Sequence, residues 1–389
     1  MTILNVAYPL MPVSECSGGG AEQILYILQR GLVKAGHRSI VIAAGGSLVD
    51  SHLVQATRPS SEITDEVRCS AQQAHQDAIY IALQRYPVDL IHFHGLDFYE
   101  YLPRVRVPML ATLHLPVDWY PRSIFELPQV VLNLVSRSQA ASHSAAACLP
   151  VVCNGVELWR YSPSEDGGDF LLMLARICPE KGVDVGLRIA YRLGLPLILA
   201  GPIHPYEAHR RYFAERVQPL LDDRRCYIGP VGARTRTALL ARAKCLLVPS
   251  LVQETSSLAA MEAICSGTPV IGFRSGALPE VIDQGSSGFI VDSEEEMAEA
   301  VGRVGEISAK RCRAIGESRF DSRRMVREYL AIYDRLVRED GHRMLRMRTV
   351  VPLIQRSGGE LTTNCSELQA SARRISAAEC SSSTCRASR

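Results

Sequence analysis

Short runs of apolar, mostly β-branched residues alternate with amphipathic stretches along most of the chain. In the first half the runs lie at residues 3–8, 39–43, 89–93, 109–112, 130–135 and 151–153. Between them, apolar residues recur at three- and four-residue spacing over 21–35 and 71–85, and Gly36 follows the first of these stretches, where a helix typically ends. Strands that alternate with helices predict βαβ units, in which helices cover both faces of a parallel sheet.

The second half repeats this pattern after a loop at 159–169 that is rich in Ser, Pro, Asp and Gly. We expect strands at 170–175, 197–200, 226–228, 245–248, 269–273 and 288–291, and helices at 183–193, 206–221, 234–243 and 257–266. The sequence therefore predicts an α/β protein with two doubly wound, Rossmann-like domains, residues 1–158 and 159–320. Facing domains of this kind bind a ligand in the cleft where the carboxyl ends of both sheets meet.

The character of the chain changes beyond residue 340. Residues 343–389 contain no Phe, Trp or Tyr, and residues 341–389 carry eight Arg, three Glu and no Lys. Such a segment buries too little apolar area to offset its chain entropy, so we expect a disordered basic tail at 341–389. The basic and apolar run 343–348 is either a contact with an anionic membrane surface or an irregular end of the last helix.

Composition and charge limit the class of protein. The chain has 389 residues, a net charge of +2 and 47% hydrophobic residues, as expected for a soluble globular protein that does not bind nucleic acid through charge alone. It has no uncharged apolar run of about 18 residues that would span a membrane, and residues 1–6 resemble a strand rather than a signal peptide. The twelve scattered cysteines form no C-x-x-C pair. We expect buried, reduced thiols in a cytoplasmic protein, which would be peripheral on the inner membrane surface if the basic run contacts lipid.

The segment 254–270 carries the most informative chemistry. Ser256 and Ser257 are favourable N-cap residues, so a helix is expected to begin there and to direct its positive dipole end towards the sheet edge, where a phosphate binds. Glu254 and Glu262 would repel a phosphate but suit the hydroxyls of a ribose and a sugar. A capped core helix with a solvated glutamate explains the same spacing equally well.

Two further segments are expected at sheet edges. Arg176 and Lys181 are separated by a turn that contains Pro179, which can bring both cations onto one diphosphate, although most loop cations are merely solvated. The glycine-rich turn 18–20 opens the first helix and lets backbone amides approach a ligand. It does not match a dinucleotide fingerprint, because Gln23 stands at the third glycine position and no acidic residue ends the second strand.

Taken in order, these motifs resemble glycosyltransferase family 4, whose members are retaining enzymes with the GT-B fold. Glu254 and Glu262 match its E-x7-E motif, and Arg176 and Lys181 match its R-x4-K motif. The remaining matches are the G-G-x-E loop at 18–22, His114 after the fourth predicted strand, and an N-G-V-D-like segment at 154–157. The chain departs from the family at Ala175, where glycine is usual, at Ser256, where an aromatic residue is frequent, and at Ser257, a common alternative to glycine.

The resemblance implies a hexosyltransferase-type enzyme that acts in polysaccharide or glycoconjugate biosynthesis. Its donor would be a UDP- or GDP-sugar, its acceptor a glycan, a lipid-linked molecule or a small molecule, and it would need neither a cofactor nor a metal, in keeping with the lack of an Asp-x-Asp motif. A helix at 321–340 would cross back to the amino-terminal domain. The implied roles are leaving-group stabilisation by Arg176 and Lys181, sugar contacts by Glu254 and His114, ribose binding by Glu262, and phosphate contacts at Gly19, Gly20, Ser257 and Leu258.

Other interpretations stay open at this stage. A nicotinamide-linked oxidoreductase would share the domains but is disfavoured by the missing fingerprint, whereas a non-catalytic nucleotide-sugar binder, a GT-B epimerase or a phosphorylase would keep the same cleft. His92 and His94 share a strand face without an evident third metal ligand, so an acceptor-side or structural role is preferred. Asp97 and Glu100 could contact acceptor hydroxyls, although their spacing indicates nothing beyond solvation, and loops such as 45–65 would bind the acceptor.

Overall fold

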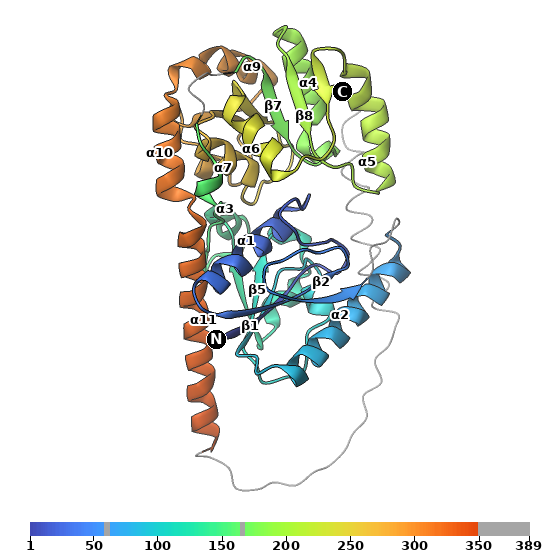
Figure 1. The fold of residues 1–389 in the computed structure, drawn as a ribbon, viewed down its shortest axis with the longest axis vertical. Coiled ribbons are helices and arrows are strands. Elements are labelled where there is room, and N and C mark those ends of the chain that lie inside the picture. The colour runs from blue at the N-terminus through green and yellow to red at the C-terminus, as the bar shows by residue number, and fades with distance from the viewer. Residues whose placement is uncertain (58–62, 164–167, 349–389) are drawn as a thin grey trace. The chain divides into compact units, whose positions relative to one another are not determined.

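The computed structural model describes residues 1–57, 63–163 and 168–348, and within them the chain forms two parallel six-stranded sheets (Figure 1). The first sheet has the order β3-β2-β1-β4-β5-β6. Its strands are β1 (Thr2–Val6), β2 (Arg38–Ala44), β3 (His52–Thr57), β4 (Leu90–Phe93), β5 (Met109–Leu113) and β6 (Val130–Leu134). Its helices are α1 (Gly20–Lys34), α2 (Asp65–Arg85) and α3 (Arg137–Ser142).

The second sheet has the order β12-β11-β10-β7-β8-β9. Its strands are β7 (Leu171–Leu174), β8 (Leu197–Ala200), β9 (Arg225–Tyr227), β10 (Cys245–Val248), β11 (Val270–Phe273) and β12 (Gly288–Val291). The helices that follow are α4 (Val183–Arg192), α5 (Glu207–Tyr212), α6 (Ala233–Arg242), α7 (Leu258–Cys265), α8 (Leu278–Val281), α9 (Glu294–Arg303), α10 (Ala309–Arg319) and α11 (Ser322–Arg348).

Both sheets share one topology. In each, the first strand in the chain lies in the middle, two strands are added on one side, and the chain then crosses to the other side for the remaining three. The order therefore reverses between β1 and β4 and again between β7 and β10, which are the positions where doubly wound sheets bind ligands. The prediction of two Rossmann-like domains is confirmed.

Alternating side chains bury both faces of the first sheet. Ile3 and Leu90 point towards the core that contains α1, whereas Leu4 and Ile91 pack in the cluster that includes residues of α2. This arrangement explains why the strands are continuous apolar runs, since a parallel sheet covered on both sides has no face that must be polar.

Helix α11 returns to the first domain, as predicted for the cross-over helix (Figure 1). Met325, Tyr329 and Tyr333 are fully buried in the same core as Ile3 and Leu28. The crossing is fixed by backbone hydrogen bonds next to it, in which the amide of residue 156 donates to the carbonyl of residue 320 at 2.7 Å and the amide of residue 322 donates back at 2.9 Å. Both sheets and the packed part of α11 belong to one compact unit, Met1–Asp340.

Four segments differ from the expectations. The stretch 45–65 contains an edge strand, β3, whose half-exposed residues lack a clear apolar alternation, and the expected strand at 151–153 is only an isolated bridge between Leu134 and Val151. The expected helix at 206–221 splits into α5 and a π-helical turn, Phe213–Val217. Helix α11 continues to Arg348, so the tail prediction is wrong for 341–348, while the rest of the predicted tail lies outside the described residues.

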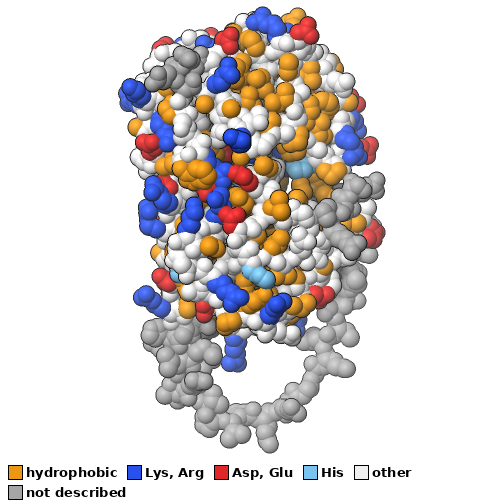
Figure 2. Space-filling view, viewed as in Figure 1, with side chains coloured by type: hydrophobic (Ala, Val, Ile, Leu, Met, Phe, Trp, Pro, Cys, Tyr) orange, Lys and Arg blue, Asp and Glu red, His pale blue; other side chains and the backbone are white. Residues whose placement is uncertain are grey.

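The described surface mixes acidic and basic side chains, as the face in Figure 2 shows. Within the described residues, no helix is both long and apolar enough to cross a membrane. The nine cysteines described are all unpaired, but the expectation of buried thiols holds only in part, because some lie at the surface. Four are buried (Cys178, Cys245, Cys265, Cys312), two are partly buried (Cys153, Cys226) and three are exposed (Cys16, Cys69, Cys148).

Candidate functional site

The glycine-rich turn and the start of α7 lie opposite each other. A Cβ atom on Gly19 would come within 1.9 Å of the Glu22 carboxylate, and a Cβ on Gly20 would lie 3.8 Å from Leu258 Cδ1. A side chain at Gly19 would therefore displace the Glu22 carboxylate, while a side chain at Gly20 would meet the first residue of α7 at ordinary contact distance. The first turns of two helices, one from each domain, thus approach each other at the switch points of the two sheets.

The start of α7 differs from the predicted capping. Ser257 is the N-cap residue, but it adopts a left-handed conformation with φ 59° and its side chain does not cap the helix. Ser256 is buried and its hydroxyl accepts a hydrogen bond of 2.9 Å from Asn154 Nδ2 at the junction of the domains. Because no side chain caps α7, its first backbone amides remain available to an anion.

Lys181 and Glu254 form an ion pair at the carboxyl edge of the second sheet. The Lys181 ammonium and the Ser250 hydroxyl both donate to Glu254 Oε1. The Lys181 side chain is 22% exposed and that of Glu254 only 9%. Burial raises the pKa of Glu254, but the lysine charge and the two hydrogen bonds outweigh it, so the net pKa is lowered and the carboxylate is ionised at neutral pH.

Arg176 is the second predicted cation at this edge, where it follows β7. No hydrogen-bond or ion-pair partner of its guanidinium is found in the part of the chain that the structure describes. Its charge reaches two buried carboxylates of the site: it counteracts the effect of burial on the pKa of Glu22 and helps to lower the pKa of Glu254. Arg176 is therefore a partly exposed cation that faces both domains without being neutralised by either.

Glu262 lies one helical turn inside α7 and is buried. The Tyr161 hydroxyl donates to its Oε1 at 2.9 Å, and Arg236 Nη1 donates to the same oxygen at 3.2 Å. Both contacts leave the second carboxylate oxygen, Oε2, for another donor. A small cavity of about 30 Å³ lies beside this group, with Gln23 and Arg160 among its lining residues.

Sequence reasoning missed Tyr161 and Arg236. Tyr161 lies 101 residues before its glutamate and Arg236 lies 26 residues before it. Tyr161 stood in a loop identified by composition alone, and Arg236 is one of several bases on α6. Only the fold shows which of them faces α7.

His114 follows β5 and is buried at the domain junction. Its ring Nε2 lies 3.1 Å from His94 Nδ1, and its carbonyl accepts a hydrogen bond of 2.8 Å from the Thr255 hydroxyl. Burial lowers the pKa of His114 to about 3, so the ring is neutral at physiological pH. The loop that carries Glu254 is thereby joined directly to the strand end that carries His114.

His92 of β4 and His94, which directly follows this strand, are part of the core. His92 bonds through both ring nitrogens, at 2.7 Å each, to the hydroxyls of Tyr333 and Thr112, which leaves neither nitrogen for a metal. Asp97 is also buried, and it accepts hydrogen bonds from Gln72 and Tyr101 rather than facing an open site. The structural interpretation of His92 is thus confirmed, and the acceptor contact of Asp97 stays a prediction.

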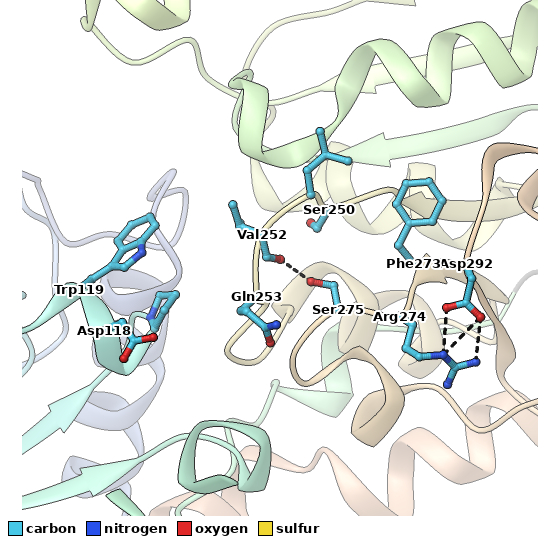
Figure 3. A pocket seen from close by; sticks show the side chains of 11 residues that line it. Asp118, Trp119, Ser250, Val252, Gln253, Phe273, Arg274, Ser275 and Asp292 are labelled. Carbon is cyan, nitrogen blue, oxygen red and sulfur yellow. Dashed lines mark hydrogen bonds and ion pairs between the residues drawn. The ribbon is translucent and has the colours of Figure 1, made fainter. Parts of the chain in front are cut away.

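A larger hollow of about 620 Å³ lies next to the residues that directly precede Glu254 (Figure 3). Asp118 and Trp119 of the first domain form one wall, and the loop 250–253 with Ser275 of the second domain forms the other. Trp119 is 46% exposed. Over the described residues, none of the predicted site residues lines this hollow, but Ser250 does, and its hydroxyl also bonds to Glu254.

Two family models match the chain. The model described as Glycosyltransferase Family 4 matches residues 18–156, and the model described as Glycosyl transferases group 1 matches residues 168–306. The first covers the domain that holds Gly19, Gly20 and His114, and the second covers the domain that holds Arg176, Lys181 and both site glutamates.

Curated relatives match over parts of their length. The chain is 30% identical over 219 residues to a D-inositol 3-phosphate glycosyltransferase of Saccharomonospora viridis, an alignment that covers 49% of this chain and 51% of the relative. A protein of the same name from Corynebacterium efficiens is 33% identical over 99 residues, 25% of this chain and 23% of that protein. The alignments thus span about half or less of these relatives.

Solved structures match over nearly their whole length. Sucrose-phosphate synthase of Thermosynechococcus elongatus superposes with a TM-score of 0.74 at 17% identity, covering 86% of this chain and 98% of that one. HepE of Anabaena, solved in complex with UDP-glucose, gives a TM-score of 0.68 at 16% identity over 86% of this chain and 99% of that one. The family models show that the chain contains a Glycosyltransferase Family 4 domain at residues 18–156 and a Glycosyl transferases group 1 domain at residues 168–306, and the similarity to the solved structures shows that it has the GT-B fold.

Proposed function

We propose that this protein is a retaining glycosyltransferase that moves a sugar from a nucleoside diphosphate to a glycan, lipid-linked or small-molecule acceptor, with no metal at the diphosphate. The observation that carries the proposal is one sheet edge that combines two cations, Arg176 and Lys181, with the uncapped start of α7. Two side-chain cations and a helix N-terminus provide the charge that a metal supplies in other enzymes that bind diphosphates.

The Lys181–Glu254 pair suits an exchange of partners when the donor binds. In the free protein the two charges neutralise each other. A diphosphate would draw the ammonium towards itself and leave the Glu254 carboxylate to accept hydrogen bonds from sugar hydroxyls. The site therefore keeps a buried carboxylate ready without leaving it unpaired, which would be costly.

Glu262 is proposed to bind the ribose of the donor. Tyr161 and Arg236 hold its Oε1, so Oε2 can accept a hydrogen bond from a ribose hydroxyl. The turn at Gly20 and the amides near Leu258 would lie between this group and the sugar, at the phosphates. The glutamates thus mark the two ends of a nucleotide sugar, with the cations between them.

The chemical step needs stabilisation of the departing diphosphate more than a protein nucleophile. As the sugar–oxygen bond breaks, negative charge grows on the bridging oxygen, and fixed cations and amides interact more strongly with that state than with the bound donor. His114 is neutral and is proposed to contact the donor sugar beside the reacting carbon. Attack from the face that the diphosphate leaves would retain the anomeric configuration.

The names of similar proteins guide the choice of substrates. HepE was solved with UDP-glucose, and several relatives are named for transfer to D-inositol 3-phosphate, so UDP- and GDP-sugars are the first donors to test, and phosphorylated polyols are suitable acceptors. The hollow beside Trp119 is proposed to receive the acceptor, because it adjoins the Glu254 loop and offers an exposed indole on which a sugar ring can stack.

A thermal-shift and hydrolysis screen with UDP-, GDP- and ADP-sugars tests this function. We expect one nucleotide series to raise the melting temperature and its sugar donor to be hydrolysed slowly, in EDTA as well as in magnesium. Binding without turnover, even with acceptors added, would favour a non-catalytic binder, and stabilisation by NAD alone would favour an oxidoreductase. No nucleotide-dependent stabilisation at all would contradict the proposal.

A further inference from the structure

A second cluster of reactive side chains lies on the turn that carries Lys181. Cys178, Glu180 and His209 each place one ligand atom within 4.8 Å of the others. Cys178 directly precedes the 3₁₀ turn Pro179–Lys181, and His209 lies on α5, about 30 residues further along the chain. Two separate elements of the second domain thus bring together a thiol, a carboxylate and an imidazole.

The proposed glycosyl transfer leaves two members of this cluster without a role. Cys178 is fully buried, and its thiol makes a long contact of 3.8 Å with the carbonyl of Arg176 and interacts with the Glu180 carboxylate of the same cluster. His209 Nδ1 is buried and has no hydrogen-bond partner among the described residues. A buried ring nitrogen without a hydrogen-bond partner requires an explanation, and a bound ion is one that the neighbouring thiol and carboxylate support.

The donor set favours one class of ion. Thiolate and imidazole are the usual ligands of Zn²⁺, with a carboxylate as a frequent third, whereas Mg²⁺ and Ca²⁺ prefer oxygen alone. Around a tetrahedral zinc the ligand atoms lie about 3.5 Å apart, so small side-chain rotations would close the cluster. One thiolate and one carboxylate would also cancel the charge of the ion, which is favourable so close to Arg176.

We propose that Cys178, Glu180 and His209 bind a zinc ion that fastens the Lys181 turn to α5, with the fourth position open to water. The turn is already held by the ion pair of Lys181 with Glu254, by the hydrogen bond of 2.9 Å from the Leu251 amide to the Glu180 carbonyl, and by the close packing of Gly182 against the carbonyl of Pro249. Zinc would add a link between this turn and α5. This site lies outside the proposed diphosphate contacts, so transfer without a metal at the diphosphate and zinc at this cluster are separate claims.

Zinc chloride added to the metal-stripped full-length protein tests the site. We expect one zinc per chain by plasma mass spectrometry after gel filtration, and a rise in melting temperature on zinc addition. The Cys178→Ser and His209→Ala variants should lose both effects, and Glu180→Gln should bind zinc more weakly. Cys226→Ser and His143→Ala are matched controls outside the cluster and should keep both effects.

Cobalt provides a readout that does not depend on stability. Co²⁺ bound through a thiolate gives a charge-transfer band in the near ultraviolet, which should appear in the parent protein and in Cys226→Ser but not in Cys178→Ser, provided that the circular dichroism of the variants is unchanged. The inference is overturned if the parent protein binds no stoichiometric zinc, if no thiolate band appears, or if zinc binding survives both Cys178→Ser and His209→Ala.

Discussion

Replacing Lys181 by methionine separates the structural from the catalytic part of its role. The change removes the only cation bonded to Glu254 among the described residues and leaves the carboxylate, 9% exposed, with the Ser250 hydroxyl as its remaining side-chain donor. Breaking a buried ion pair on one side typically costs 3–5 kcal/mol. Because Lys181 is 22% exposed and water can take its place, we expect a loss of about 2 kcal/mol in the free energy of unfolding.

The same substitution should lower kcat about a hundredfold, since one charged contact to the leaving group in a closed site is worth about 3 kcal/mol. Adding Glu254→Gln to Lys181→Met removes the unpaired buried charge. The double variant should therefore regain most of the lost stability while its activity stays low. An Arg176→Ala/Lys181→Ala double variant should lose less activity than the two single losses combined, because both cations act on the same diphosphate.

Urea unfolding and steady-state kinetics with the preferred nucleotide sugar measure both effects. If Lys181→Met raised only the KM for the donor while kcat held, the cation would be a ground-state anchor, and the amides at the start of α7 would have to stabilise the leaving group. If Lys181→Met/Glu254→Gln recovered activity together with stability, the lysine would serve only to neutralise Glu254. Either result would refute the reasoning.

Five further changes test other parts of the structure. Glu262→Ala should weaken binding of the free nucleoside diphosphate, whereas Glu254→Ala should spare it and weaken binding of the sugar donor; equal losses in calorimetry would contradict this division. His75 is buried, and burial lowers its pKa to about 4 in the folded protein. Between pH 6.5 and pH 4 the unfolded chain therefore binds a proton at His75 more readily than the folded protein does, and the free energy of unfolding falls as the pH drops. His75→Leu should remove a penalty of about 2 kcal/mol at pH 5 and almost none at pH 8, and an equal gain at both pH values in urea unfolding would show another cause. Ser257→Gly should raise the melting temperature, because glycine adopts the left-handed conformation of residue 257 without the steric cost of about 1 kcal/mol that serine has there. A lower melting temperature would show that the serine side chain stabilises the site. Removal of 341–389 should leave the melting temperature nearly unchanged but reduce sedimentation with anionic liposomes if the run 343–348 contacts lipid; clear destabilisation would show that the segment packs.

Much of the fold could be predicted because its strands are fully buried. Runs such as Leu197–Ala200 and Cys245–Val248 are apolar at nearly every position, so their bounds follow from hydrophobicity alone. The edge strand β3 (His52–Thr57) was missed because its residues are half-exposed and include His and Gln, which removes the apolar signal. The end of α11 was placed too early because residues 341–348 are basic and contain no aromatic residue, as in the segment that follows them.

The site was predictable where spacing within one segment carries the chemistry. Glu254 and Glu262 lie on one loop and helix, and Arg176 and Lys181 on one turn, so their neighbourhood is local. The capping prediction failed at Ser257 because sequence preference does not show when a residue must adopt a left-handed conformation.

Contacts that join distant segments required the fold. The His94–His114 pair links neighbouring strand ends, and the hydrogen bond from Asn154 to Ser256 crosses 102 residues. Nothing in the local pattern indicates either pairing.

The most direct test of the central claim is a crystal structure with the nucleoside diphosphate that stabilises the protein most. We expect the terminal phosphate to lie within hydrogen-bond distance of Arg176, Lys181 and the Leu258 amide, with the ribose on Glu262 and the Lys181–Glu254 pair opened. A nucleotide bound elsewhere, for example in the hollow beside Trp119, or one whose phosphates leave the Lys181–Glu254 pair intact, would contradict this claim.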